Sequence, residues 1–442
     1  MRLLVASTDG ADPSTTLHHS VSFSPKESNS MRKTALFVAS GLVAALALTG
    51  CSASGGGTAS TSPVNLTMWT GFTGGDRPAY EAIIKDFNSS QKNIQVTMDV
   101  QPWDTISQKL PAAWATGQGP DLATPNFDPN VISKYLDTNS LLALDSTTVG
   151  AKDLAPSAVT AFTAKGKLYA VPANIATLQL YYNKALFTKA GISTPPTTVA
   201  EFQADAKQLT NGGNFGLALA DHETIQMWPV LQWLDGADIV DAKGCAVIDS
   251  ATSVKSLRTW ADLVVKDKVS PVGKTGAEAD ALFSAGKAAM EINGPWAAAG
   301  YTKAGVDFGV ASIPAGEKGS VTLASTVPLA ISKATKHAKE AQEFLAFYTG
   351  KVAQTKFALA SGFPPVRTDL GEDAALKANP VIASFAAALP TARLYLPGVT
   401  GATQIDSDVY VPLIGKITRG EDVAQVTADA AKKINTITGC KN

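Results

Sequence analysis

The sequence predicts an α/β fold in which strands and helices alternate and the strands pair largely in parallel. Residues 64–70 (VNLTMWT) read as a strand, and apolar side chains alternate along 94–100 in a second strand. Between these strands, residues spaced i, i+3, i+4 and i+7 mark one face of a helix: Tyr80, Ile83, Ile84 and Phe87. Residues 121–124 form a third predicted strand. This strand–helix–strand order favours an α/β architecture.

The later elements rest on the same kind of evidence. A helix-like segment begins at Asp104, has an expected kink at Pro111 and ends at 117–120 (GQGP). Residues 167–183 are extended and apolar, and 198–201 (TVAE) form a capping box that opens a helix. The pattern then predicts strands at 288–292, 306–313 and 328–332, and helices at 254–264, 341–348 and 423–434. Elements of both kinds therefore continue to the C-terminal part, which is mostly helical by pattern.

The first fifty residues have the layout of a secretory signal. Two cations in 31–34 (MRKT) precede an apolar run at 35–48, and the small residues Thr49 and Gly50 follow. As a helix this run would span roughly 21 Å, less than the roughly 30 Å of a bilayer core, so a permanent membrane span is the weaker interpretation. Because secretory signals rarely begin thirty residues into a chain, we expect translation to start at Met31.

Cys51 stands between that apolar run and a tract that can hardly fold. The sequence LTGC at 48–51 resembles a bacterial lipobox, in which the cysteine is acylated and becomes the new N-terminus. The residues that follow, up to 63, are rich in Ser, Gly, Ala and Thr and are typical of a loose tether. We therefore expect 1–50 to be a signal region and 51–63 a lipidated cysteine with its tether, anchored to the outer face of the cell membrane. An ordinary secreted chain is the alternative.

Charge and cysteine content exclude some partners and leave one question open. The chain has 37 Lys+Arg and 38 Asp+Glu, a formal net charge of −1, which gives no electrostatic reason to expect nucleic acid. With Cys51 acylated, Cys245 and Cys440 remain, and outside the cell they either pair or stay free. The length leaves room for two domains or one large one.

Catalytic and metal-binding motifs are missing from the sequence. Two of the four histidines, His18 and His19, precede the signal, and His222 and His337 are isolated. There is no HExxH, no GxSxG and no phosphate-binding glycine loop, and Cys and His are too sparse for a metal cage. We expect no enzyme, no metal and no cofactor, although a spatial pair of carboxylates is invisible in a sequence.

The seven tryptophans are more informative. A sugar binder needs aromatic platforms bordered by carboxylates, amides or guanidinium groups. Trp103 directly follows a predicted strand, where α/β ligand crevices lie, and Trp296 stands in a turn after another strand (NGPW, 293–296). The others sit inside helices or a strand and are interpreted as packing: Trp69, Trp114, Trp233 and Trp260, with Trp228 left open between core and cleft wall.

Several segments, in order along the chain, resemble the extracellular sugar-binding proteins of ABC importers. GDRPAYEAIIKDFNSSQKNIQV and ATGQGPDLA are similar to the family's first lobe. LQLYYNKALFTKAGISTPPTTVAEFQADAKQLT, FSAGKAAMEINGPW and PLAISKATKHAKEAQEFLAFYTG resemble its later passages. The resemblance implies a maltodextrin-binding-protein-like, two-lobed fold of type II, similar to periplasmic binding proteins. Such a protein captures a carbohydrate by hinge closure and delivers it to the transmembrane subunits of an ABC permease.

The resemblance also implies where the lobes lie. The first lobe would cover 64–172 plus 308–350, and the second 173–307 plus 351–442. Crossing segments would run at 172–177 and near Val306 and Gly350. We expect a monomer that closes around its ligand.

Site residues carry over one position at a time. Trp296 matches the family's stacking ring in the second lobe, and Asp128 and Glu223 match carboxylates that contact sugar hydroxyls. Phe72, Thr73 and Asn174 should border the cleft. Trp103 is placed there by position alone, Trp228 is either cleft wall or core, and Arg393 and Tyr395 are further candidates for ligand contact.

Departures from the family pattern put maltodextrin in doubt as the ligand. Pro125 and Ile225 stand where the maltodextrin binder has aromatic rings, so a shorter or differently shaped saccharide is expected. A non-sugar or charged solute, such as a sugar phosphate, a polyol or ferric iron, is the alternative; iron is included because Tyr181 and Tyr182 are adjacent. Two alternatives come from other functional classes: a secreted lipoprotein that cleaves glycans, and an inert surface adhesin.

Overall fold

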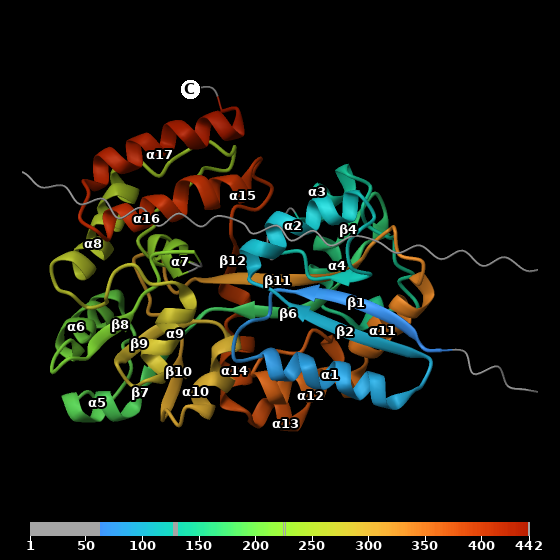
Figure 1. The fold of residues 1–442 in the computed structure, drawn as a ribbon. Coiled ribbons are helices and arrows are strands. Elements are labelled where there is room, and N and C mark those ends of the chain that lie inside the picture. Colours follow the sequence, from blue (N-terminus) through green and yellow to red (C-terminus); the bar gives the residue numbers. More distant parts are fainter. Residues whose placement is uncertain (1–61, 127–130, 224, 226, 441–442) are drawn as a thin grey trace, which may run out of the picture. The chain divides into compact units, whose positions relative to one another are not determined.

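A computed structural model describes residues 62–126, 131–223, 225 and 227–440. In this part of the chain, strands gather into a six-stranded and a four-stranded sheet, with a small hairpin besides. Figure 1 shows β6 and β11 running side by side across the middle, with helices on either side of them. The alternation of strands and helices expected from the sequence is confirmed.

The six-stranded sheet has the order β12-β11-β3-β1-β2, with β6 paired to β11. Its pairing is mixed, so the expectation of largely parallel strands is only half right. β1 runs parallel to β2 and β3, whereas β11 runs antiparallel to β3 and β6. The strands are β1 (Val64–Thr70), β2 (Ile94–Val100), β3 (Leu122–Ala123), β6 (Ala170–Thr177), β11 (Thr322–Ile331) and β12 (Ala392–Leu394).

The four-stranded sheet has the order β10-β7-β9-β8. Its central strand β9 pairs parallel with β8 and antiparallel with β7, and every residue of β9 is buried. The strands are β7 (Gln179–Asn183), β8 (Phe215–Ala218), β9 (Ala288–Asn293) and β10 (Phe308–Ala311). A separate hairpin joins β4 (Thr163–Ala164) and β5 (Lys167–Leu168).

Helices cover both sheets. Those that contribute side chains to the core of the first sheet are α1 (Arg77–Ser90), α2 (Trp103–Ala115), α3 (Val131–Asp137), α11 (Ala338–Tyr348) and α12 (Lys351–Ser361). Those in the core of the second are α5 (Lys184–Ala190), α6 (Val199–Leu209), α7 (Met227–Leu234), α8 (Ala251–Val265), α9 (Gly276–Ser284), α10 (Ala298–Lys303), α14 (Pro380–Ala387), α15 (Ala402–Ile405), α16 (Val411–Ile417) and α17 (Val423–Thr438). The short α4 (Pro156–Ala161) contacts β6, and α13 (Ala374–Ala378) precedes α14.

Local signals act as the sequence predicts. Thr198 and Glu201 cap α6 reciprocally, which satisfies backbone donors at its first turn. Along α11 the buried face is Ala341, Phe344, Leu345 and Tyr348, as the spacing predicts. The helix α2 runs through Pro111 to Ala115. None of the helices in the described ranges has the length and apolar character needed to cross a membrane.

Each sheet has its own large apolar core. One cluster takes its side chains from 66–176 and 327–366, the other from 178–323 and 385–434. The chain therefore passes from one core to the other three times: between Ala176 and Leu178, between Leu323 and Val327, and between Val366 and Phe385. The range expected for the first lobe includes β10, but this strand pairs within the second sheet. The range expected for the second lobe includes Phe357, but its ring packs in the first core. Both differences arise from long-range pairing and packing. The lobe limits themselves stay a prediction.

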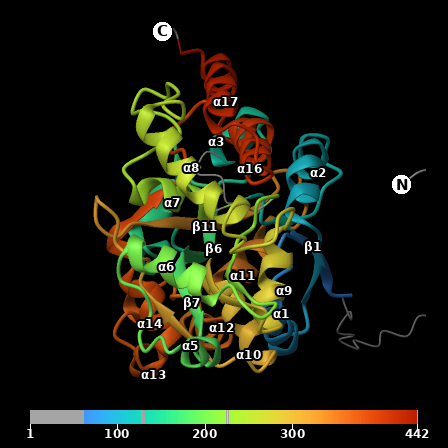
Figure 2. The same cartoon turned by 90° about the vertical axis from the view of Figure 1, so that its left-hand side faces the viewer.

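The C-terminal helices join the second core. In Figures 1 and 2, α16 and α17 lie beside α8, and the three helices contact one another. Cys440, just beyond α17, forms a disulfide with Cys245, their Cα atoms 5.4 Å apart. Near it, the amide of Ala246 donates to Oδ1 of Asn435. The pairing that the sequence left open is thus made in the structure, and it fastens the last helix.

Candidate functional site

A first cavity of about 170 Å³ lies where β1 and β9 end and against β6 and β11. The loop after β1 supplies Phe72 and Thr73, and the turn after β9 supplies Trp296. Trp103 comes from the first turn of α2 and Asn174 from β6. All five were expected at the cleft from the sequence, and the fold brings them to one cavity. Strand ends of an α/β sheet are where such crevices form.

Two glycines make room for the two tryptophan rings. A Cβ on Gly71 would lie 2.1 Å from Cδ2 of Trp103, and a Cβ on Gly294 would lie 2.1 Å from Cζ3 of Trp296. Each indole therefore lies flat against a bare backbone at the end of a strand. The hydroxyl of Tyr181 donates to the carbonyl of Gly294 at 2.9 Å, which holds the second turn in place. These contacts position both rings before any ligand arrives.

An aromatic stack supports the floor of this cavity. Phe72 is buried and stacks on Tyr80 with ring centroids 3.7 Å apart, and it meets Trp103 edge-on at 5.6 Å. The amide of Asn174 donates to the hydroxyl of Tyr80 at 2.7 Å. Thr73 remains exposed. Asn174 thus holds Tyr80 through a hydrogen bond and also lines the cavity.

A second cavity of about 450 Å³ adjoins the first, because Trp103 and Ser325 line both. Its other walls include Glu223, Ile225 and Tyr395. Glu223 has a left-handed backbone, with φ of 60°, and an exposed side chain. The loop before it is held by Asp221, whose carboxylate accepts hydrogen bonds from the amides of 273 and 274.

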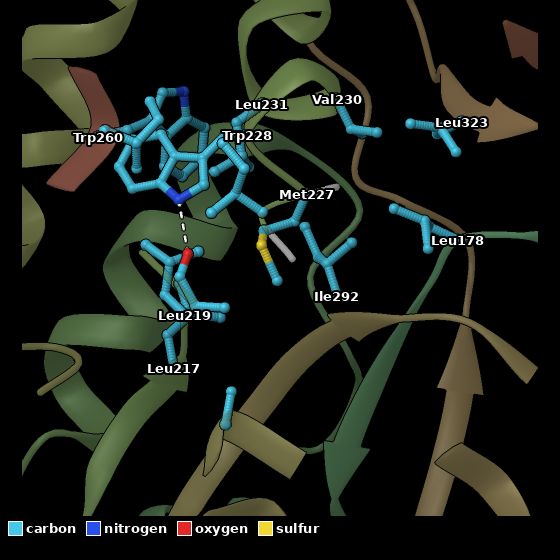
Figure 3. Packing of buried hydrophobic residues seen from close by; sticks show 14 of the residues in the cluster. Leu178, Leu217, Leu219, Met227, Trp228, Val230, Leu231, Trp260, Ile292 and Leu323 are labelled. Carbon is cyan, nitrogen blue, oxygen red and sulfur yellow. Dashed lines mark hydrogen bonds between the residues drawn. The ribbon is translucent and has the colours of Figure 1, made fainter. Parts of the chain in front are cut away.

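Two of the expected site residues lie outside both cavities. Trp228 is fully buried and donates through Nε1 to the carbonyl of Ala220 at 2.8 Å, so it belongs to the core (Figure 3). Arg393 is exposed, bonds to Asp238 at 2.8 Å and lies over the ring of Trp233, outside both cavities. Asp128 falls outside the described residues, as does Cys51.

Sequence reasoning missed a group of carboxyls in the first cavity: Asp76, Asp280 and Glu291. Asp76 precedes α1, Asp280 lies in α9 and Glu291 in β9. Burial raises the pKa of Asp76 to about 7 and that of Asp280 to about 6. Burial, then the nearby charge of Asp280, raises the pKa of Glu291 well above its usual value. Both effects favour the protonated form of Glu291.

Hydrogen bonds tie two of these carboxyls into one network. The amide of Asn293 donates to Asp280 at 2.6 Å, and the hydroxyl of Tyr301 donates to Glu291 at 2.5 Å. Glu291 also forms a hydrogen bond with Asp280. This bond lowers the pKa of Asp280 and raises the pKa of Glu291, so it favours the ionised form of Asp280. One signal was available: Glu291 interrupts an otherwise apolar strand (AAMEIN) two residues before the NGPW turn. For Asp76 and Asp280 the sequence carries no such signal.

Comparisons with known proteins agree with this fold. The chain is 25% identical over 345 residues to the maltotriose-binding protein of Pyrococcus abyssi, covering 74% of this chain and 72% of that protein. The structure of the GacH receptor of Streptomyces glaucescens, solved unliganded and with acarbose, superposes with a TM-score of 0.78 at 24% identity. That match covers 86% of this chain and all of the receptor.

Another solved structure, the maltose-bound MalE3 of Thermotoga maritima, matches with a TM-score of 0.75 at 25% identity, over 84% of this chain and 99% of that one. These neighbours establish a two-lobed fold of type II, similar to periplasmic binding proteins. The model of the family "Bacterial extracellular solute-binding protein" matches residues 82–384, which is most of the chain. The chain therefore belongs to the bacterial extracellular solute-binding proteins.

Proposed function

We propose that this protein captures a carbohydrate, a mono- or oligosaccharide, between its lobes and delivers it to the transmembrane subunits of an ABC permease. The observation that carries the proposal is the pair of preset rings, Trp103 and Trp296, on one cavity. A sugar has apolar C–H faces ringed by hydroxyls, so flat rings bordered by directional polar groups recognise it. The amide of Asn174 and the carboxyl of Asp280 supply such groups beside the rings.

The two adjoining cavities support an oligosaccharide more than a single sugar. Their volumes, about 170 and about 450 Å³, together fall in the range of ligand pockets, about 300–1,000 Å³. The first cavity would hold one ring against Trp296, and the second would hold further rings past Trp103. Support for a saccharide of this size comes from similar proteins: one is a maltotriose-binding protein, and two were solved with maltose or acarbose.

Maltodextrin is not the saccharide we propose. Ile225 lines the second cavity where the maltodextrin binder has a ring, and Pro125 takes the place of another. Tyr395 lines the same cavity and offers a ring from a different direction, with its hydroxyl 2.9 Å from Asp406. The platforms are thus differently placed, which favours a saccharide of another shape.

Anionic solutes and ferric iron have less support as ligands. Lys134 is the basic residue among the linings of the two cavities in the described chain, so a sugar phosphate or acid would meet mostly carboxyls. For ferric iron, Tyr181 is fully buried with its hydroxyl bonded to Gly294, and no group of three ligating residues in the searched part of the chain is arranged for a metal. A glycan-cleaving activity would release reducing sugar from polysaccharide, which the proposed receptor would not.

We also propose that the chain is held at the outer face of the membrane through Cys51 and works as a monomer. The tether of residues 52–63 would keep the binding protein at high effective concentration near its permease. The hinge for closure would lie in the two strand segments where the chain passes between the cores, near Thr177 and Ser325.

The test is thermal unfolding of the purified protein, freed of bound ligand, against a panel of mono- and oligosaccharides at millimolar concentration. A ligand at about a hundred times its dissociation constant stabilises by about 2.7 kcal/mol, a readable rise in midpoint. Trp296→Ala should abolish that rise. Trp233→Phe, at a tryptophan that lies outside both cavities, is the matched control and should keep it. A flat panel on folded protein would contradict the proposal.

A further inference from the structure

The first cavity has an unusual balance of charge. Its lining includes the three carboxyls Asp76, Asp280 and Glu291 but no Lys, Arg or His among the described residues. Arg77, next to Asp76 in the chain, pairs with Glu81 at 2.7 Å, and Lys274 pairs with Glu278 at 3.6 Å; both bridges are partly exposed, and neither cation lines the cavity. No basic side chain of the described chain therefore compensates a negative charge in this cavity.

Asp76 is the residue in this group that lacks a partner. Its side chain is 3% exposed, and among the described residues no other residue donates a hydrogen bond to it. The carboxylate accepts from its own backbone amide instead. Its Oδ1 lies 3.0 Å from where a Cβ on Gly74 would stand, so the bare glycine leaves that side of the carboxyl open. A buried carboxyl left without a partner is costly unless something else meets it.

The groups that face the three carboxyls cannot supply that compensation. Tyrosines surround them from four elements: Tyr80 of α1, Tyr181 of β7, Tyr301 of α10 and Tyr348 of α11. Each has its pKa raised well above the usual value by burial, so each is neutral at physiological pH. The neighbours of Asp76 and Asp280 are thus acids or neutral hydroxyls, and closing the lobes on a neutral ligand would leave their charge without a counter-ion.

We propose that Asp76 and Asp280 form a subsite for a cationic amino group carried by the ligand, in the cavity that Trp103 and Trp296 also line. The inference deepens the proposed function and rests on it: the saccharide is an amino sugar or a similar aminated ring. Glu291 accepts a hydrogen bond from Tyr301 and itself hydrogen-bonds to Asp280, so it positions the Asp280 carboxyl.

The chemistry of an ammonium group fits this arrangement. It has only donors, so it satisfies the two acceptors that the protein leaves open or partly open, and it neutralises their charge. Aromatic faces attract cations, and Phe72, Trp103 and Trp296 line the same cavity. A hydroxyl in the same place would bond to one carboxylate but would leave the charge uncompensated.

The experiment compares matched sugar pairs on the purified full chain by tryptophan fluorescence titration. The pairs are glucosamine with glucose, galactosamine with galactose, and the β-1,4 glucosamine trisaccharide with cellotriose, each at about pH 7 and about pH 5. The aminated member of at least one pair should bind tenfold tighter or more at the higher pH. That preference should vanish at the lower pH, where Asp76 and Asp280 hold protons.

Isosteric variants separate charge from shape. Asp76→Asn and Asp280→Asn should each lower the ratio of amine affinity to neutral-sugar affinity from tenfold or more to about one. Asp249→Asn, at an exposed carboxylate before α8 that lines neither cavity, should leave the preference intact.

Two further outcomes distinguish this inference from the function it rests on. If neutral sugars bind and their aminated counterparts bind no better, the cationic subsite is wrong and the carbohydrate receptor stands. If choline binds but no sugar does, the subsite stands and the carbohydrate proposal is wrong. If no probe binds, both are overturned.

Discussion

The substitution Asp76→Asn should make the empty protein more stable, and more so as pH rises. Asp76 is buried, has no donor from another described residue and faces the charge of Asp280. Asn has nearly the same shape and cannot ionise. The variant therefore removes an unfavourable charge while keeping the packing before α1.

The magnitude follows from the pKa. Asp76 has a pKa of about 7 in the folded protein against 3.8 for a free side chain, a raise of about 3 units or about 4 kcal/mol. Because the folded state holds the proton more tightly than the unfolded state, the unfolding free energy of the wild-type falls by this amount as pH rises from about 4 to about 7. Above that range the penalty is complete. For a folded unit of roughly 380 residues, about 4 kcal/mol corresponds to a midpoint shift of about 5 °C.

The assay is urea unfolding of the ligand-free wild-type and variant at a series of pH values from about 4 to about 8. The difference in unfolding free energy should be near zero at the acid end and should grow to about 4 kcal/mol at the neutral end. Asp249→Asn supplies the baseline for an exposed carboxylate. A difference that stays constant with pH would mean that Asp76 ionises normally in the folded protein, and the argument from burial would fail.

Three more predictions follow from single contacts. Gly71→Ala should weaken ligand binding tenfold or more in fluorescence titration, because the new Cβ would lie 2.1 Å from Trp103, while circular dichroism should show that the fold is retained. Gly300→Ala is the control, because its Cβ would have its nearest neighbour at 3.7 Å, and equal losses of binding in both variants would refute the steric argument. Cys440→Ser should lower the unfolding free energy by about 2–5 kcal/mol, because the disulfide closes a loop with a sequence separation of 195; an unchanged urea midpoint would contradict this. Tyr301→Phe should cost about 1–3 kcal/mol by removing the donor to Glu291, and urea unfolding at neutral pH showing no loss would mean that Glu291 finds another partner.

Local features of the site were readable from the sequence. Trp103 and Trp296 each follow a strand, and strand ends are where side chains leave the sheet, so both were expected at a crevice and both line the first cavity. Phe72, Thr73 and Asn174 were placed there through the family resemblance. Helix faces and the capping box at Thr198 depend on spacing within a few residues, which is why they match the structure.

Features that depend on distant contacts were not readable in this way. Trp228 has the same local pattern whether it faces a cleft or the core, and only the packing of α7 against α8 makes it core. Arg393 faces Asp238, far away in the sequence, instead of the ligand cavity. The mixed pairing of the first sheet likewise arises from β11, which returns late in the chain to pair with β3 and β6.

The sequence by itself determined the alternation of strands and helices, the family and the residue types that stand at strand ends, since these depend on neighbours in the chain. Tertiary structure alone decided that Asp76, Asp280 and Glu291 share one cavity, because a loop, a helix and a strand from distant parts of the chain converge there. Their raised pKa values are a property of that convergence: each carboxyl is ordinary in the unfolded chain and becomes costly to ionise only when its neighbours exclude water.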